Sequence, residues 1–421
     1  MNILLLGQGG REHALARALA ASQYLSELFI SPGNPGTAQC GQNVELNGIE
    51  EILAFCESSY IELVVISDTK LLAAGLADKI RARNIAVVGP GAKGARLESS
   101  KLVAKQFMLR HGLPTANFLP FSSKAYAEDY LKSGQADSFF EAGGLVIKED
   151  ALLSTHGLGT RLCYSKEQAL EALKEMPEGQ LLFEELLEGP EYSYISLIDE
   201  THVVPLSSVQ DHKRSHEDCR GFNTEGMGAY SPVPQLSKED EEEMKRCLEK
   251  VFYALREEEI DYRGFLYAGF IKTQQGLKIL EFNTRLGDPE AQALLPRLQI
   301  DMVELLLKCA EARLSELNLY WLKSFAVAVV LSVDGYPKEE FLTGQEILGV
   351  DEAWGLTRLH VYQGDTVDKA GSLVVAGSRP ITVVGLGSSF EEAKEKAYKA
   401  AELIKFENKR YRSDIGYQVQ V

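Results

Sequence analysis

The first hundred residues alternate short apolar runs with helical patterns. The apolar runs lie at 2–6, 28–30, 61–66 and 85–88, and the clearest amphipathic helix follows the first of them, at 12–21. This alternation predicts βαβ units around a parallel sheet, whose ligands bind at the carboxyl ends of the strands. Glycine-rich loops stand at those ends, at 7–10, 32–36 and 89–91. We therefore predict a parallel-sheet domain over residues 1–101, with a ligand site at one edge.

A second pattern follows. A helix is expected at 99–111, closed by Gly112 and Pro114. Residues 118–186 then read strand, helix, strand, strand, helix, strand, with the clearest extended runs at 145–148 and 181–185. This order predicts a small α+β lid within a second domain, which we place at 102–322.

The last half of the chain carries three further signals. Ser237 precedes Asp240 by three residues, a capping-box pattern that predicts a helix reaching about residue 257. Two β-like runs then predict a hairpin, and beyond residue 323 two strands and a helix predict a third, α+β domain over 323–421. The hairpin runs are 264–272 and 277–283, the later strands 325–333 and 381–384, and the helix 391–405. No low-complexity linker separates these units, so we expect them to pack tightly.

Composition narrows the class of protein. Lys and Arg number 44 against 61 Asp and Glu, and the net charge of −17 repels nucleic-acid phosphates. The six cysteines form no CxxC pair and indicate ordinary thiols rather than a disulfide framework. The N-terminal apolar run is too short for a secretory signal, and no stretch approaches the roughly 18 apolar residues of a membrane span. We expect a cytoplasmic protein with neither a nucleic-acid nor a membrane partner.

The first glycine loop is a candidate ligand site. Gly7, Gly9 and Gly10 follow a strand and open a helix, where free backbone N–H groups can hold an anion. A dinucleotide fingerprint needs a third glycine where Glu12 stands, and an acidic residue after the second strand, where Ser31 and Pro32 stand instead. The loop therefore indicates a phosphate or amine pocket without NAD. A plain tight turn is the alternative.

The run at 277–283 carries the sharpest chemical signal. In a strand, Glu281 and Asn283 point to the same side, which places a carboxylate and an amide oxygen together for a hard cation. Mg²⁺ takes one or two protein oxygens and completes its shell with phosphate and water. An isolated E-x-N would be an ordinary strand end, but Arg285 and a polar turn follow at once. We predict a nucleotide-associated magnesium site here.

Other polar positions are weaker signals. Lys105 and Lys148 could meet nucleotide phosphates, although each alone would be an ordinary surface lysine. Glu184, Glu185 and Glu191 could face an adenine ring and ribose hydroxyls, or form an acidic hinge. The runs 208–214 and 223–230 are polar and glycine-rich and predict substrate loops. They include His212, which has no metal-spaced partner and is expected to be structural. No Ser-His-Asp or Cys-His arrangement is evident.

Several long strings together resemble the phosphoribosylamine-glycine ligase family. They are G-Q-G-G-R-E-H-A-L at 7–15, P-G-N-P-G-T-A at 32–38, V-Q-D-H-K-R at 209–214, N-T-E-G-M-G-A-Y-S-P at 223–232, G-F-L-Y-A-G-F at 264–270, E-F-N-T-R-L-G-D-P-E-A-Q at 281–292 and R-Y-R-S-D-I-G-Y at 410–417. The resemblance runs from residue 1 to the end of the chain. It implies an ATP-grasp fold with a Rossmann-like N-terminal domain, a small lid and a C-terminal α+β domain. The combined α/β and α+β multidomain class agrees with the patterns above.

The resemblance also implies an activity and a site. Glycine would be activated by ATP to an acyl phosphate and attacked by the amine of 5-phosphoribosylamine, in purine biosynthesis. Phosphoryl transfer of this kind needs positioning and charge neutralisation more than a nucleophile of the protein. The resemblance implies that Mg²⁺ or Mn²⁺ binds to Glu281 and Asn283, and that catalysis depends on Asp211, Lys213 and Arg285. It implies that ATP is bound by Lys105, Lys148, Glu184, Glu185, Leu186 and Glu191. The substrates would be bound by Gly9, Gly10, Asn34 and Asn223. A monomer or small homo-oligomer is expected.

The sequence departs from the family in three places. The lid loop at 154–159 lacks the usual glycine-lysine-glycine, and His156 or Arg161 could substitute for its lysine. The run I-S-D-T-K-L at 66–71 replaces G-P-E-x-P-L, and Glu225 replaces a glycine. Two alternatives therefore stay open. One is an ATP-grasp ligase with another pair of substrates, and the other is a weakened paralogue that binds nucleotide without turnover.

Overall fold

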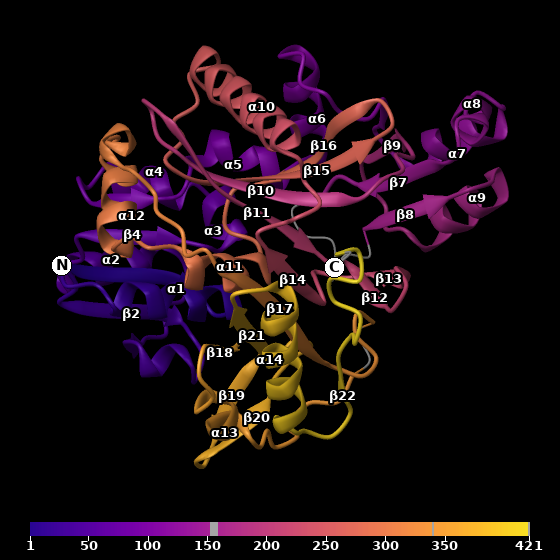
Figure 1. Ribbon diagram of the computed structural model, residues 1–421. Helices are drawn as coiled ribbons and strands as arrows, with labels where there is room; N and C mark the ends of the chain where they lie inside the picture. The colour runs from indigo at the N-terminus through magenta and orange to yellow at the C-terminus, as the bar shows by residue number, and fades with distance from the viewer. Residues whose placement is uncertain (152–158, 339–340, 420–421) are drawn as a thin grey trace.

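The N-terminal unit is a five-stranded parallel sheet. The computed structural model describes residues 1–151, 159–338 and 341–419 (Figure 1). The sheet has the order β3-β2-β1-β4-β5, and each neighbouring pair is parallel, as the alternating pattern predicts. Its strands are β1 Asn2–Gly7, β2 Glu27–Pro32, β3 Gln42–Asn43, β4 Leu63–Ile66 and β5 Ala86–Val88. The glycine loop after β1 therefore lies between the ends of β2 and β4.

Helices cover both faces of this sheet because its central strands are apolar on both sides. Leu4 and Leu6 of β1 pack in one core with Ile52 and Leu76, whereas Ile3 and Leu5 pack in another core with Leu15. The helices of this unit are α1 Gly10–Ala20, α2 Ile49–Ser58, α3 Thr69–Ala73, α4 Leu76–Arg81 and α5 Ala92–Ser99. The helix expected at 99–111 is instead α5 followed by α6, Lys101–Arg110, because Ser100 is extended and caps α6 through its hydroxyl.

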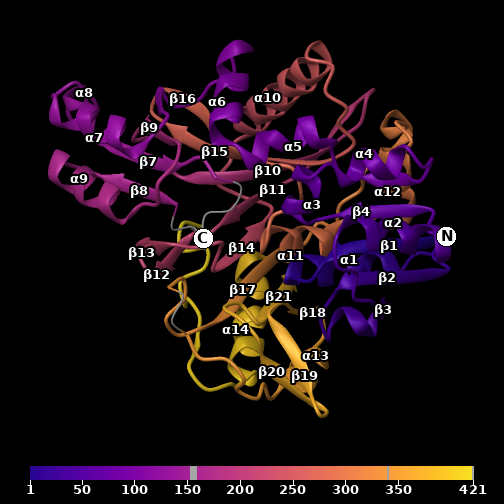
Figure 2. The same ribbon diagram turned by 180° about the vertical axis from the view of Figure 1, so that it is seen from behind.

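The lid is a four-stranded antiparallel sheet with the order β6-β9-β7-β8. Its strands are β6 Phe118–Phe121, β7 Leu145–Glu149, β8 Thr160–Cys163 and β9 Leu181–Glu185, and its helices are α7 Lys124–Lys132, α8 Asp137–Glu141 and α9 Lys166–Glu175. Two views from opposite sides place the lid helices across the molecule from the N-terminus (Figures 1 and 2). The order of elements is the expected one, with α8 added.

The centre of the molecule is one long antiparallel sheet of nine strands. Its path is β16-β15-β10-β11-β14-β17-β21-β18, and β22 pairs with β17. The bounds are β10 Glu191–Ile198, β11 Val203–Asp211, β14 Gly228–Ser231, β15 Gly264–Thr273, β16 Gly276–Asn283, β17 Phe325–Val333, β18 Leu359–Gln363, β21 Ile381–Gly387 and β22 Lys409–Arg410. The predicted hairpin is β15-β16. The domain boundary that we predict between residues 322 and 323 lies between β14 and β17 in the chain. These two strands pair directly within this sheet.

The remaining helices flank this sheet. They are α10 Lys238–Glu257, α11 Glu290–Leu294, α12 Met302–Ala310, α13 Val350–Trp354 and α14 Phe390–Leu403. The capping box at Ser237 and Asp240 is confirmed, with both reciprocal hydrogen bonds present. Two short hairpins complete the fold, formed by β12 Arg214–His216 with β13 Arg220–Asn223, and by β19 Thr366–Lys369 with β20 Ser372–Val375. All six cysteines are free thiols. Among the helices described, none combines the length and apolar character needed to cross a bilayer.

Candidate active site

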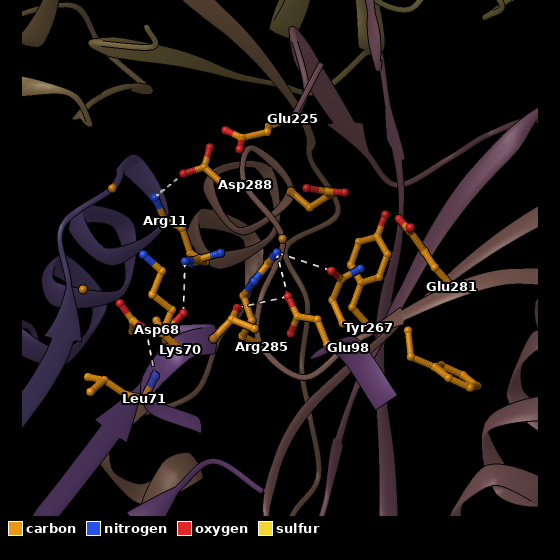
Figure 3. A pocket seen from close by; sticks show the side chains of 18 of the residues that line it. Arg11, Asp68, Lys70, Leu71, Glu98, Glu225, Tyr267, Glu281, Arg285 and Asp288 are labelled. Carbon is orange, nitrogen blue, oxygen red and sulfur yellow. Dashed lines mark hydrogen bonds and ion pairs between the residues drawn. The ribbon is translucent and has the colours of Figure 1, made fainter. Parts of the chain in front are cut away.

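A cavity of about 870 Å³ lies where the N-terminal unit, the lid and the central sheet meet. Its wall takes residues from the glycine loop, α6, β7, β9, β16 and the segment around residue 379. Of the predicted site residues, ten line it: Gly9, Lys105, Lys148, Glu184, Asp211, Lys213, Asn223, Glu281, Asn283 and Arg285. Residues from widely separated parts of the chain therefore share one space, part of which Figure 3 shows.

The end of β16 presents polar side chains to this cavity. Glu281 and Asn283 lie opposite Gly269 and Tyr267 of β15, and a register shift adds Leu280 to β16 just before them. Asn283 Oδ1 accepts from the Arg285 guanidinium at 3.3 Å, and Arg285 pairs with Glu98 at 3.0 Å. Figure 3 shows Arg285 and Glu98 joined beside Tyr267. Arg285 thus orients the amide of Asn283.

Lys213 stands between two carboxylates. Its Nζ lies 3.4 Å from Glu281 Oε1 and 3.5 Å from Glu191 Oε2. The Lys213 ammonium and, more weakly, Lys148 and Lys101 lower the pKa of Glu281 to about 2, although partial loss of solvent in the cavity opposes this. Burial alone would lower the pKa of Lys213, but Tyr267, Glu281, Glu191 and Asp211 raise it well above its usual value. Glu281 is therefore ionised and Lys213 is charged at neutral pH.

The donor set fits a divalent cation completed by phosphate. Glu281 supplies an ionised carboxylate and Asn283 an amide oxygen, both of which open on the cavity. No group of three His, Cys, Asp or Glu able to hold a metal occurs in the described ranges 1–151, 159–338 and 341–419. Two protein oxygens, from Glu281 and Asn283, are enough for Mg²⁺ when a nucleotide provides the other ligands. Manganese accepts the same ligands.

Two predicted phosphate-binding lysines share one buried carboxylate. Lys105 and Lys148 each place Nζ 2.9 Å from Glu184 Oε2, with Lys105 and Glu184 only 2% exposed and Lys148 12%. Burial, and then the charge of Lys148, lower the pKa of Lys105 to about 8. Burial opposes ionisation of Glu184, but the two lysines lower its pKa. The group carries one net positive charge at the cavity wall when all three side chains are ionised.

Backbone N–H groups at the glycine loop donate hydrogen bonds to carboxylates of the protein itself. Gly9 N donates to Glu12 Oε2 at 2.6 Å, and Arg11 N donates to Asp288 Oδ2 at 3.0 Å. Gly7 has φ +149°, and a Cβ there would stand 2.4 Å from Glu12 Cγ, so glycine is required for this turn. The N–H groups of Gly9 and Arg11 are therefore not free for an anion, in contrast to the simple expectation from the sequence.

Five predicted residues do not line the cavity. Asn34 is buried and donates to the carbonyls of Gln8 and Gln363, while its Oδ1 accepts from Gly36 and Thr37. Gly10 is buried at the start of α1, Glu185 pairs with Lys278, and Leu186 N donates to Gly144. Glu191 touches the site through Lys213. Asn34 thus joins the glycine loop to the strand β18.

Several cavity residues escaped the sequence analysis. Lys101 is one turn of helix before Lys105, and Arg11 follows the glycine loop. Glu98 and Tyr267 lie beside Arg285 (Figure 3), and Asp288 and Glu290 belong to the run 281–292 that we quoted. Helical spacing to Lys105 could have indicated Lys101. The last such residue, Arg379, pairs with Glu225 and Asp288 at 3.1 and 3.3 Å and has no local sequence signal.

The departures from the family fall partly within the described residues. Most of the loop at 154–159 lies outside them, as does His156. In the loop at 67–70, Asp68 Oδ1 caps α3 by accepting from Leu71 N at 3.0 Å, and Lys70 lines the cavity (Figure 3). Glu225 is held by Arg379. Both altered positions thus border the same cavity as Glu281.

The antiparallel lid sheet and the central antiparallel sheet both contribute to this cavity, and the ATP-grasp domain model that matches residues 99–291 assigns the protein to the ATP-grasp class. Models of the three phosphoribosylglycinamide synthetase domains match residues 1–98 (N domain), 99–291 (ATP-grasp domain) and 326–418 (C domain). The chain belongs to the phosphoribosylglycinamide synthetase family.

Similar proteins agree with this assignment. A phosphoribosylamine-glycine ligase of Pasteurella multocida is 36% identical over 99% of this chain and 98% of that protein. A trifunctional purine biosynthetic protein of Bos taurus is 39% identical, but the chain spans only 42% of its length. The crystal structure of a phosphoribosylamine-glycine ligase from Thermotoga maritima superposes with a TM-score of 0.84 at 31% identity, covering 98% of this chain and all of that one.

Proposed function

We propose that this chain joins glycine to 5-phosphoribosylamine at the expense of ATP, giving glycinamide ribonucleotide, ADP and phosphate. The observation that carries the proposal is the convergence of the Glu281 and Asn283 oxygens with Lys213 and with the Lys105–Glu184–Lys148 group on one cavity. Family membership supplies the substrate pair. We further propose that the enzyme works in the cytoplasm as a monomer or small homo-oligomer.

The reaction has two steps. A glycine carboxylate oxygen attacks the γ-phosphorus of ATP, the bond to the β-phosphate oxygen breaks, and ADP leaves. The amine of phosphoribosylamine then attacks the carbonyl carbon of glycyl phosphate, loses a proton and expels inorganic phosphate. A divalent ion on Glu281 and Asn283 would neutralise charge on the transferred phosphoryl group.

The charged residues suit these steps. Lys105 and Lys148 present their ammonium groups from a fixed anchor, Glu184, and are proposed to bind the nucleotide phosphates. Lys213 and Arg285 hold Glu281 and Asn283 in place and are proposed to stabilise the negative charge that develops in transfer. Glu185, Leu186 and Glu191 are proposed for the adenine and ribose side. Gly9, Gly10, Asn34 and Asn223 are proposed for the phosphoribosylamine side.

The direct test is a coupled assay with pure protein, ATP, Mg²⁺, glycine and freshly generated phosphoribosylamine. ADP release that requires both glycine and phosphoribosylamine, together with formation of glycinamide ribonucleotide, supports the proposal. ADP release that requires a different acid points to the alternative ligase. Nucleotide binding without turnover points to the non-catalytic alternative, and either of these results refutes the proposed reaction.

Nucleotide affinity should depend on the protonation of Lys105. Because its pKa is about 8 in the folded protein, the free enzyme loses this charge as the pH rises through 8, and the KM for ATP should increase by several-fold between pH 7 and 9. Stability responds with the opposite sign. The unfolded chain holds the Lys105 proton up to about pH 10.4, so this residue makes folding more favourable as pH rises from about 8 to 10.4.

The measurement is a pH series of the KM for ATP at saturating glycine and phosphoribosylamine. Lys105→Arg serves as the matched variant, because its guanidinium does not titrate in this range. A KM for ATP with the same rise above pH 8 in this variant would assign the titration to another group.

A further inference from the structure

His212 lies between two residues of the cavity wall but outside the cavity itself. Asp211, which ends β11, and Lys213 line the cavity, whereas His212 does not. Successive side chains of an extended segment point to opposite sides, so the His212 ring faces away from the substrate space. Its backbone is fixed against the start of β14, since His212 N donates to Gly228 O at 2.8 Å and its carbonyl accepts from Met227 N at 2.9 Å. The catalytic steps proposed above make no use of this ring.

The ring takes its hydrogen bonds from the C-terminal segment 412–418. His212 is 3% exposed, and its Nε2 lies 3.0 Å from Gly416 N and 3.1 Å from Gln418 Oε1. Each neutral tautomer makes one of the two contacts, because Nε2 either accepts from the Gly416 N–H or donates to the Gln418 oxygen. Burial, and then the charge of Arg412, lower the pKa of His212 to about 4, so the ring is neutral at physiological pH. The His212 side chain therefore ties the chain just beyond β11 to this segment.

The same segment holds the residue on the other side of Lys213. Arg412 is 2% exposed, pairs with Asp414 at 2.7 Å, and donates from Nη1 to Arg214 O at 3.0 Å. Lys213 O itself accepts from Thr224 N at 2.7 Å. Figures 1 and 2 show the C-terminal segment beside the β12–β13 hairpin. The chain is thus fixed immediately before, at and immediately after Lys213.

We propose that His212 is a positioning residue: held by the C-terminal segment, its ring sets the backbone from which Lys213 reaches Glu281. This inference rests on the proposed function, in which Lys213 stabilises the charge that develops in phosphoryl transfer. The geometry is demanding, because Lys213 Nζ lies 3.4 Å from Glu281 Oε1 and 3.5 Å from Glu191 Oε2 at the same time. A misplacement of about 1 Å can cost about a hundredfold in rate. The C-terminal segment thereby acts on phosphoryl transfer without lining the cavity.

The test compares His212→Leu with His212→Gln. Leucine keeps the apolar packing and removes the hydrogen bonds, whereas the glutamine amide ends as many bonds from Cα as His Nε2 and can restore them. We expect kcat for ADP release to fall about 10- to 100-fold in His212→Leu and to return to within about threefold of the unchanged protein in His212→Gln. The KM for ATP should stay within about twofold in both, because Lys105 and Lys148 are held by Glu184 on other elements. If His212→Leu does not fold, His212→Asn takes its place, since its amide ends one bond short of both partners.

Two further variants separate positioning from a purely structural role. His360→Leu removes a partly buried histidine of β18 that does not line the cavity, and its kcat should be unchanged. In a Lys213→Met background, His212→Leu should lower kcat no further, because a residue that acts through Lys213 then has nothing left to position. A further fall in kcat in this background, or equal kcat values in His212→Leu and His212→Gln, would overturn the proposal.

A readout without turnover keeps this test apart from that of the proposed function. The crystal structure of His212→Leu should show Lys213 Nζ beyond hydrogen-bonding distance of Glu281, while that of His212→Gln keeps the contact. An unchanged contact in His212→Leu refutes the positioning role whether or not the protein is a ligase. If the unchanged protein releases ADP only with another acid, the reaction proposed above fails, and the same variants then measure positioning with that acid.

Discussion

Glu281→Gln should lower Mg²⁺-dependent formation of ADP by roughly a thousandfold, equivalent to about 4 kcal/mol of transition-state stabilisation. The substitution keeps the size of the side chain and removes its charge. The unchanged protein holds this carboxylate ionised, with a pKa of about 2 beside Lys213. A neutral amide would leave Lys213 and Asn283 facing the phosphates with little affinity for a divalent ion. The measurement is kcat for ADP release as a function of Mg²⁺ concentration.

Folding should survive this change because Glu281 lies at the surface of the cavity, with its side chain 43% exposed, and because Lys213 keeps Glu191 as a partner. The circular dichroism spectrum should match that of Glu242→Gln, an exposed carboxylate on α10 that serves as the control, while the melting temperature should fall modestly because the ionised Glu281 stabilises the folded state beside Lys213. Turnover by Glu281→Gln at the rate of this control would remove the metal assignment. A variant that melts early would instead be replaced by Asn283→Leu, which probes the second ligand.

Patterns within short stretches of the sequence predicted the helices and strands whose formation depends on neighbouring residues. Short apolar runs identified β1, β4 and β5, the capping box at Ser237 identified the start of α10, and the glycine between two β-like runs identified the β15-β16 hairpin. Each of these signals is carried by residues close together in the chain. The pairing of β14 with β17 lacks such a signal, since Gly228 and Val329 meet only in the folded protein. The continuity of the central sheet was therefore not predictable.

The same limit applies to the site. Glu281 and Asn283 were singled out because strand geometry places them on one side, and Lys105 because it and Lys148 could together meet nucleotide phosphates. The sequence did not show that Glu184 would be enclosed by Lys105 and Lys148, since these residues come from three separate elements. Arg379, in the C-terminal region, pairs with Asp288 only because the fold brings the two residues together. Charge pairing across elements thus decides which polar residues face substrate and which are neutralised by the protein.

Glu184→Leu should reduce the free energy of unfolding by about 3–5 kcal/mol, because it leaves two buried ammonium groups without a counter-ion. Lys105 and Lys148 both contact the same oxygen, Oε2, so one substitution removes the counter-ion of both, and Lys105 keeps only the hydroxyl of Thr115. Lys148→Met should reduce the free energy of unfolding much less, since the Lys105–Glu184 pair remains and Lys148 is the more exposed lysine. Urea unfolding followed by circular dichroism gives the comparison. An equal loss of unfolding free energy in Glu184→Leu and Lys148→Met would show that the shared carboxylate does not hold the two lysines together. The proposed phosphate-binding pair would then have no anchor.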